Sequence, residues 1–329
     1  MKISEAMTAL VGAAEAATPI CLWGPPGIGK TSLAEAVKSE RKVDRMITLR
    51  ANLMEPVDFN GYPWPREGRM TFLKPDFHPD ESETGILFID ELPQAPMAVQ
   101  CAAMRLVDSC PSTWQVIAAG NRSTDRAGAG QVATHVLSRF THIDIDVSRD
   151  DWQSWAARSG VRPEVRAFID YRPALLHSFE AADAQKNRAF PSPRSWHRVS
   201  RLLDCVQKDV LLQLLSGTVG EGPGAEFWGF LQVYEKCPSP DVIIAKPTET
   251  MVPREPSALF AVCAALADRA RTMKPDKIEP ILVYMNRLPI EFGAVLITDL
   301  LAIHTSVVNS PIANKWISAH RDVFGNSRS

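Results

Sequence analysis

The residues best suited to chemistry form a glycine-rich segment near the start of the chain, Gly24–Thr31 (GPPGIGKT). This segment follows a short apolar run, Pro19–Trp23, and opens a stretch with Leu33 and Val37 at helical spacing. Glycines let backbone N–H groups curl around an anion, and a helix that begins there adds positive potential. The match to G-x-x-x-x-G-K-[ST] in this setting predicts a phosphate-binding loop, and a tight turn that only resembles one is the weaker interpretation.

Each position of this loop has an expected task. Lys30 should reach the β- and γ-phosphates of ATP and take part in catalysis, and the hydroxyl of Thr31 should ligate Mg²⁺. The residues expected to contact the nucleotide are Gly24, Pro25, Pro26, Gly27, Ile28, Gly29, Lys30, Thr31 and Ser32.

A pair of carboxylates follows a second apolar run. The segment Ile86–Glu91 (ILFIDE) is typical of a buried strand that ends in two acids. We expect Asp90 to hold Mg²⁺, directly or through its water shell, and Glu91 to polarise the attacking water as the general base. Taken alone, Glu91 could be an acid favoured by the dipole of a helix start. Together with the upstream phosphate loop, the pair predicts ATP hydrolysis.

The elements around these segments indicate the fold class. Apolar runs that alternate with helical patterns predict an α/β fold, with a parallel sheet and helices on both of its faces. After Ser148 the patterns are helical. The expected strands are 19–23, 46–50, 85–89, 114–119 and 141–147.

We predict three parts along the chain. Residues 1–148 form the nucleotide-binding α/β domain, residues 149–236 a helical lid, and residues 237–329 a helical C-terminal extension. A proline-rich linker at 237–256 opens the extension. The following segment, 258–270, is apolar nearly all round and is expected to be a buried helix.

Composition bounds the class of protein. The 329 residues carry a net charge of −2 and no basic tail, which gives no whole-protein attraction to nucleic acid. Six scattered cysteines form no C-x-x-C pair, so neither a zinc site nor a disulfide framework is predicted. No apolar run reaches the roughly 18 residues of a membrane helix and no signal peptide is visible, so we expect a cytoplasmic protein.

On these motifs the chain resembles AAA+ ATPases, in particular the MoxR-like group of the dynein-related branch. The resemblance implies that Asn121, in AAGNR, is a sensor 1 residue that holds the lytic water or the γ-phosphate. It also implies that Arg194, in FPSPRSW, acts as sensor 2 from the lid, where Pro193 suits the start of a helix. The plainer interpretations are an Asn that closes a turn and a solvated basic face, which we prefer for Arg198 and Arg201.

The resemblance further implies an arginine finger. Arg139, in LSRF, would act as a catalytic residue in the ATP site of the neighbouring subunit, and Arg122 and Arg126 could share this task. An ordinary surface arginine is the alternative. Because a finger of this kind has no use within its own subunit, we expect a homo-oligomeric ring, and a hexamer in particular.

An insert after the second strand resembles the pore-lining insert of this group. Gly61–Thr71 (GYPWPREGRMT) reads as a hairpin with Glu67 and Gly68 at its tip, and Tyr62 and Trp64 are candidates to face a central pore. A hairpin that packs on its own ring surface is equally compatible with the sequence.

The resemblance implies a chaperone-like motor that uses ATP and Mg²⁺ to remodel or activate a partner protein complex. Members of this group are often paired with a protein that carries a von Willebrand factor A-type domain. Two other classes stay open: a nucleic-acid motor, which the charge disfavours, and a slow ATP-dependent switch that regulates binding partners. One departure is the short connection at 107–113, which puts the group's second pore loop in doubt.

Overall fold

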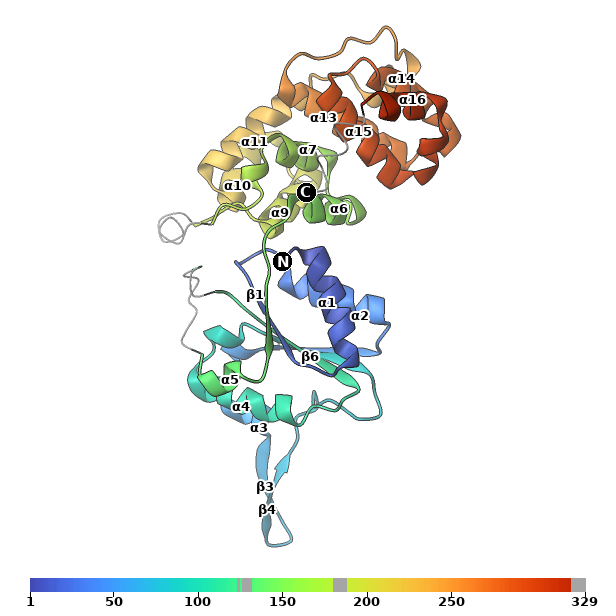
Figure 1. The fold of residues 1–329 in the computed structure, drawn as a ribbon. Coiled ribbons are helices and arrows are strands. Elements are labelled where there is room, and N and C mark those ends of the chain that lie inside the picture. The colour runs from blue at the N-terminus through green and yellow to red at the C-terminus, as the bar shows by residue number, and fades with distance from the viewer. Residues whose placement is uncertain (123–124, 126–131, 180–187, 321–329) are drawn as a thin grey trace. The chain divides into compact units, whose positions relative to one another are not determined.

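The computed structural model describes residues 1–122, 125, 132–179 and 188–320 of the chain. It divides into two compact units, whose elements are labelled in Figure 1. Unit 1 comprises Met1–Trp152 and His177–Arg194, and unit 2 comprises Gln153–Leu176 and Ser195–Ser329.

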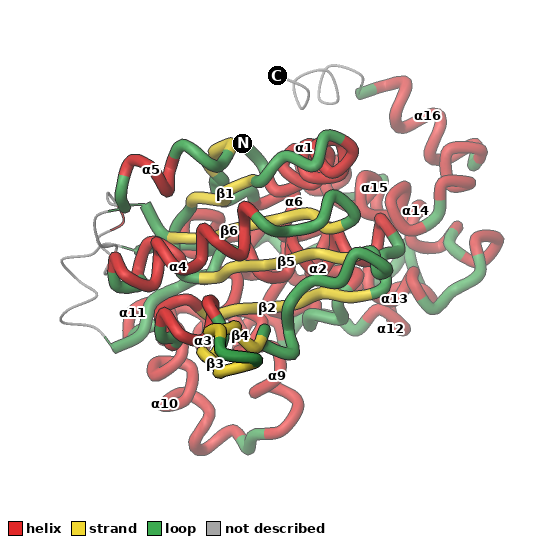
Figure 2. Tube along the Cα trace, turned by 90° about the horizontal axis from the view of Figure 1, so that it is seen from below, coloured by secondary structure: helices red, strands yellow, loops and turns green. Residues whose placement is uncertain are grey.

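A five-stranded parallel sheet forms the centre of unit 1. Its strands are β1 Ile20–Trp23, β2 Arg45–Arg50, β5 Gly85–Asp90, β6 Trp114–Gly120 and β7 Thr141–Asp144. The order is β2-β5-β6-β1-β7 with every neighbouring pair parallel, and Figure 2 shows β2, β5, β6 and β1 side by side. The predicted strands and the α/β fold class are therefore confirmed.

Helices cover both faces of this sheet. They are α1 Ile3–Glu15, α2 Lys30–Arg41, α3 Pro56–Asn60, α4 Met97–Asp108 and α5 Thr134–Leu137, with the short 3-10 turns η1 Ala51–Leu53 and η2 Leu92–Gln94. Ile86 and Phe88 of β5 share a buried cluster with α1 and α2, whereas Leu87 and Ile89 share another with α3 and α4. Successive strand residues point to opposite faces, so the unbroken apolar run of β5 is buried from both sides.

An antiparallel hairpin extends from the body of unit 1 (Figure 1). Its strands are β3 Tyr62–Arg66 and β4 Arg69–Leu73. The turn residues Glu67 and Gly68 both have positive φ, 51° and 73°, as in the type I′ turns that match the twist of a hairpin. The predicted hairpin and its tip are confirmed.

Unit 2 is helical, which confirms the predicted helical C-terminal region. The helices α6 and α9 begin within the residues of unit 1, and the rest lie in unit 2. They are α6 Arg149–Arg158, α7 Pro163–Tyr171, α9 Pro193–Cys205, α10 Lys208–Val219, α11 Glu221–Tyr234, α12 Pro240–Ala245, α13 Pro256–Arg271, α14 Glu279–Met285, α15 Ile290–Ile303 and α16 Pro311–Ala319, with the 3-10 turns η4 Pro173–Leu175, η5 Pro275–Lys277 and η6 Thr305–Asn309.

The proline-rich segment at 237–256 is not only a linker, because it contains α12. Ser239 caps this helix by accepting a hydrogen bond from the backbone N–H of Val242 at 3.4 Å. Pro240 occupies the first turn, where a missing N–H costs nothing. Ile243 is fully buried in the apolar cluster of the C-terminal helices, so tertiary packing retains a helix that proline content argued against.

The predicted lid and the predicted extension lie together in unit 2. Helix α7 of the lid packs against α13 of the extension, which is buried along most of its length as expected. Residues 177–194 belong to unit 1 instead. The three-part division at residues 148 and 236 stays a prediction beside this two-unit division. Among the described residues, no helix combines the length and apolar character that a bilayer crossing requires.

Candidate nucleotide site

The glycine-rich loop joins β1 to α2 through backbone that favours glycine. Gly27 and Gly29 have φ values of +79° and +108°, and Lys30 is the first residue of the helix. At Gly27 a side chain would also collide, because its Cβ would lie 2.8 Å from the hydroxyl oxygen of Ser192. The loop therefore needs glycine for conformation at both positions, and for space at Gly27.

Lys30 is held inside this loop by neutral oxygens. Its Nζ donates to the carbonyl oxygens of Gly24 (2.6 Å) and Pro25 (3.1 Å) and to Oδ1 of Asn121 (3.0 Å). Burial lowers the pKa of Lys30 to about 8, although the nearby Asp90 opposes that shift. A phosphate group is a stronger partner for this ammonium than the carbonyls it now contacts.

Two hard oxygen donors lie together at the start of α2 and the end of β5. The Thr31 hydroxyl donates to Oδ2 of Asp90 at 3.2 Å, and the other carboxylate oxygen accepts from the backbone N–H of Glu91 at 3.0 Å. Hydroxyl and carboxylate oxygens are the ligands that Mg²⁺ prefers, so the donor set of these two residues fits a magnesium ion. We propose Thr31 and Asp90 as its ligands.

The chain turns sharply at Glu91, directly after β5. Glu91 adopts a left-handed conformation with φ 56° and ψ 30°, which is rare for a residue with a side chain. Such backbone costs on the order of 1–3 kcal/mol and gathers at functional sites. Its carbonyl accepts the backbone N–H of Gln94 at 3.0 Å, which closes the turn into η2. This strain is independent support for the proposed catalytic role of Glu91.

The register of the sheet brings these groups together. In the parallel ladders, Trp23 pairs with Gly120 and Ile89 pairs with Ala118, so the carboxyl ends of β1, β5 and β6 meet at one edge. Asn121 follows β6 directly and reaches Lys30 from there. The predicted roles of these side chains stay proposals. The structure places Lys30 in direct contact with Asn121, and Thr31 in direct contact with Asp90.

A segment far along the chain completes this edge of unit 1. The backbone N–H of Arg194 donates to the carbonyl oxygen of Gly27 at 3.1 Å, while its side chain is exposed. Nε2 of His177 donates to the carbonyl oxygen of Pro26 at 3.3 Å, and burial lowers the pKa of this imidazole. His177 and Ser192 carried no sequence signal, since they are separated from the loop by about half the chain.

Arg139 has a partner within its own subunit, contrary to the argument that it has no use there. Its Nε donates to Oδ1 of Asp108 at 2.9 Å and its Nη2 to Oδ2 at 3.0 Å, a two-pronged pairing. Its Nη1 also donates to the carbonyl oxygen of His135 at 2.6 Å. The side chains of Arg139 and Asp108 are 35% and 52% exposed, so the pair remains accessible.

The other arginines near the predicted subunit edge differ. Arg122 is held within its own chain: Nη2 donates to the Ile145 carbonyl (2.7 Å) and the Asp146 carboxylate (2.8 Å), and Nε lies 3.0 Å from Asp144. Arg122 therefore ties the end of β6 to β7, and its share in the task of the finger stays a prediction. Arg126 lies outside the described residues. Arg198 and Arg201 are exposed on α9, as a solvated basic face would be.

A further pair links the phosphate loop to the segment of Arg139. Trp23, the last residue of β1, donates its indole N–H to Nδ1 of His142 at 2.9 Å. Nε2 of His142 then donates to the carbonyl oxygen of Leu137 at 3.0 Å. These partners fix the neutral tautomer with its proton on Nε2.

The hairpin aromatics are exposed in the single chain. Tyr62 is 65% and Trp64 54% exposed, and Met70 and Phe72 on β4 are exposed to a similar degree. Among the described residues of unit 1, no side chain covers these aromatics, so they remain accessible to a partner.

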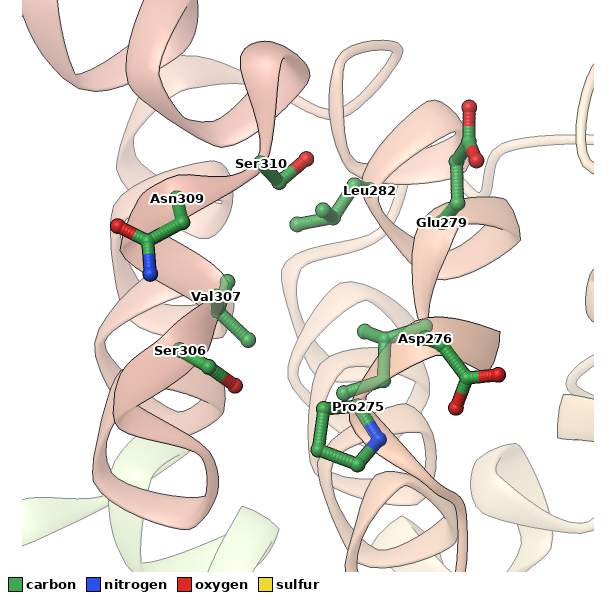
Figure 3. Close-up of a pocket in the computed structure, with 9 residues that line it drawn as sticks. Pro275, Asp276, Glu279, Leu282, Ser306, Val307, Asn309 and Ser310 are labelled. Carbon is green, nitrogen blue, oxygen red and sulfur yellow. The ribbon is translucent and has the colours of Figure 1, made fainter.

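Unit 2 contains a pocket of about 360 Å³ between η5 and η6. Figure 3 shows Leu282 and Val307 reaching into it, while the carboxylates of Asp276 and Glu279 point away. Because these carboxylates point away from it, the pocket lacks the charged groups that meet at the edge of the sheet in unit 1.

Residues 20–141 match the profile of the ATPase family associated with various cellular activities (AAA). No curated protein matches the chain. Among solved structures, the chain is similar to the Thermotoga maritima RuvB Holliday junction branch migration motor, with 19% identity, 70% of this chain and 69% of that chain covered, and a TM-score of 0.38. Brucella abortus NtrX in complex with ATP shows 12% identity over 99% of this chain and 68% of that chain, with a TM-score of 0.40. A DNA polymerase III gamma subunit-related protein from T. maritima shows 11% identity over 96% and 90%, with a TM-score of 0.38.

The parallel sheet and the phosphate loop define a P-loop ATPase. More particularly, the chain carries an ATPase domain of the AAA family over residues 20–141. The family profile ends at the first residue of β7, so the arrangement of unit 2 rests on the structure alone.

Proposed function

We propose that the chain is a MoxR-like AAA+ ATPase that works as a ring, expected to be a hexamer, and uses ATP hydrolysis to remodel or activate a partner protein complex in the cytoplasm. The observation that carries the proposal is the hydrogen-bonded cluster at the carboxyl edge of the sheet. It consists of Lys30 with Asn121, and Thr31 with Asp90.

The residues of the cluster divide the work of phosphoryl transfer. The backbone of the glycine-rich loop and Lys30 bind the β- and γ-phosphates. Glu91 orients and activates the attacking water, and Asn121 accepts a hydrogen bond from that water. Thr31 and Asp90 would hold Mg²⁺, which would supply positive charge to the phosphate oxygens.

Two arginines complete the proposed site. Arg194 contacts the loop through its own backbone N–H, which donates to the Gly27 carbonyl. Its positive charge also contributes to lowering the pKa of Lys30. Arg139 contacts Asp108 and His135, which are outside the cluster, so its proposed action is on the ATP of a neighbouring subunit. In that case Asp108 orients the guanidinium through its two-pronged contact, and Arg139 stabilises charge in the transition state.

The hairpin is the proposed contact with the client. Pro63 and Pro65 lie opposite Phe72 and Met70, and two prolines in alternate positions leave β3 without N–H donors on one side. Strand addition at that edge is therefore blocked. The exposed side chains of Tyr62, Trp64 and their neighbours would instead bind a polypeptide.

The closing test uses the Glu91→Gln variant, which should bind ATP, lose turnover and stay assembled. Wild-type turnover per subunit should rise with protein concentration, because Arg139 acts only in an assembled ring. A pull-down with Glu91→Gln and ATP should enrich a client, for which a protein with a von Willebrand factor A-type domain is the first candidate. The matched control is Glu40→Gln, an exposed glutamate on α2, which should behave as wild type.

Three results would redirect the proposal. Turnover raised severalfold by DNA would favour a nucleic-acid motor. Partner binding that survives in Glu91→Gln while wild-type turnover is very slow would favour a regulatory switch. Turnover independent of concentration, with a monomer in solution, would contradict the ring.

A further inference from the structure

Gln94 lies between the two residues proposed to act on the attacking water. It ends the turn η2, three residues after Glu91, and is partly buried. With the Gln94 amide oriented so that donors face acceptors, its side-chain nitrogen donates to the carbonyl oxygen of Glu91 at 3.2 Å. Its side-chain oxygen accepts from both the backbone N–H (3.0 Å) and the side-chain Nδ2 (3.1 Å) of Asn121.

The orientation of these amides follows from Lys30. An ammonium group only donates, so the Asn121 atom that contacts Lys30 at 3.0 Å must be the oxygen Oδ1. The Nδ2 of Asn121 then faces Gln94, whose facing atom must be an acceptor. The remaining amide nitrogen of Gln94 finds the strained Glu91 carbonyl. One continuous chain of hydrogen bonds therefore joins Lys30, Asn121, Gln94 and Glu91.

We propose that Gln94 is a positioning residue for ATP hydrolysis, which fixes the amide of Asn121 so that its oxygen faces the reacting groups. This inference rests on the catalytic roles proposed above for Asn121 and Glu91. When phosphate draws Lys30 away, Oδ1 of Asn121 loses its donor and is free to accept from water. Gln94 still holds Nδ2, so the amide cannot rotate by half a turn and present a donor to that water.

The same contact couples the two sides of the site. Gln94 takes two hydrogen bonds from Asn121 and gives one to the backbone of Glu91, whose left-handed φ of 56° needs support from its surroundings. A side chain of similar size without an amide would fill the space but release Asn121. The expected loss therefore falls on turnover and not on ATP binding, since Gln94 does not contact the phosphate loop.

Gln94→Leu and Gln94→Glu separate these contributions. Gln94→Leu should lower kcat by about tenfold, with KM for ATP changed less than about threefold, as for an interaction made mainly in the transition state. Gln94→Glu keeps an acceptor for Asn121 but sets a carboxylate oxygen against the Glu91 carbonyl in place of a donor, so it should recover only part of the turnover. Asn121→Ala should show a loss at least as large. The double variant Gln94→Leu/Asn121→Ala should be no slower than Asn121→Ala alone, because the two residues act as one unit.

The matched control is Gln115→Leu. Gln115 is a buried glutamine on β6, the strand that carries Asn121, and donates to the Leu10 carbonyl at 2.7 Å, away from the cluster. Its loss should lower stability and leave kcat per folded molecule unchanged. A Gln94→Leu variant with wild-type kcat, or losses that multiply in the double variant, would overturn the inference.

A second measurement does not depend on turnover. In nucleotide-free protein labelled with ¹⁵N, the side-chain NH₂ signals of Asn121 should shift in Gln94→Leu and stay in place in Gln115→Leu. Wild-type protein without ATPase activity would count against the proposed function, while this NMR comparison would still decide whether Gln94 holds the amide. Unchanged Asn121 signals in Gln94→Leu would contradict the inference directly.

Discussion

The carboxyl edge of the sheet in unit 1 and the core of unit 2 use their polar groups in opposite ways. At the edge, the loop carbonyls after β1 and the Asn121 amide after β6 hold Lys30, whose pKa burial lowers to about 8. Glu91, directly after β5, has a strained backbone. In unit 2 the large buried cluster is apolar. Arginines such as Arg172, paired with Glu226, and Arg269, paired with Asp241, lie nearer its surface, although Arg166 of α7 is buried.

This difference separates the groups that serve ATP chemistry from the groups that stabilise the fold. Buried polar groups with weak partners cost stability, and they are kept where a ligand can supply the missing interaction. The pocket of unit 2 fits this contrast, because its carboxylates point away from it (Figure 3). Substitutions at the edge should therefore impair ATP use more than folding, and substitutions in the core of unit 2 should do the reverse.

The largest effect is expected at Lys30. Lys30→Ala removes the only ammonium shown to reach both the loop carbonyls and Asn121, so ATP turnover should fall by on the order of 10³-fold. The protein should fold normally, and its stability should not decrease, since a poorly paired buried charge is removed. ATPase assays and thermal unfolding measure the two outcomes. Lys38→Ala, on the same helix and partly exposed, is the control and should match wild type.

The core of unit 2 supplies the opposite case. Leu266 on α13 is fully buried in the apolar cluster, and Leu266→Ala should cost about 2–5 kcal/mol of unfolding free energy through lost burial and a residual cavity. At low temperature, where the variant stays folded, kcat per folded molecule should equal that of wild type. Denaturant unfolding and ATPase assays on one sample test this. A kcat loss comparable to that of Lys30→Ala would break the separation of the two regions.

Two glycines of unit 1, Gly27 in the phosphate loop and Gly12 in α1, should respond to substitution in opposite ways. Gly27→Ala places a side chain at positive φ and within 2.8 Å of the Ser192 hydroxyl, so it should weaken ATP binding by about ten- to a hundredfold. Gly12→Ala, in the middle of α1 with nothing within 4 Å of the new Cβ, should raise stability by up to about 1 kcal/mol. Calorimetric titration with ATP and unfolding curves distinguish the two. Equal ATP affinity in both variants would show that the loop tolerates the distortion.

The smallest effect is a dependence of ATP binding on pH. The pKa of Lys30 is lowered from 10.5 to about 8 in the folded protein, so the folded state loses this proton before the unfolded state does. Unfolding free energy from this group therefore rises between about pH 8 and 10.5, because the unfolded chain binds more protons there. ATP needs the ammonium form, so its affinity should fall by about fivefold from pH 8 to 9, as the protonated fraction of Lys30 does.

Titration calorimetry in buffers of different ionisation enthalpy should show proton uptake on ATP binding near pH 8.5. Lys30→Arg keeps its charge throughout this range and should bind ATP with little dependence on pH. Loss of affinity with rising pH in Lys30→Arg as well would place the titration on another group.

Local patterns were sufficient for much of the site and the fold. The phosphate loop and the strand before Asp90 are written in consecutive residues, and the apolar runs of β1, β5 and β6 reflect burial on both faces of a parallel sheet. The hairpin was predictable because a two-residue turn needs positive φ, which Gly68 adopts readily. The prediction was wrong where the proline content suggested only a linker, because the burial of Ile243 stabilises helix α12 in that segment.

The sequence alone determined that a phosphate loop and an acidic strand end are present, because each motif is local. Only the tertiary structure decided how they are completed. His177 and Arg194 contact the phosphate loop from far along the chain, and His177 lies 151 residues from Pro26. Gln94 contacts Asn121, which lies on a different strand end. Arg139 likewise received its partner, Asp108, from the packing of α4 and α5. Such contacts depend on which surfaces meet in the folded protein, and the periodicity of the sequence does not predict them.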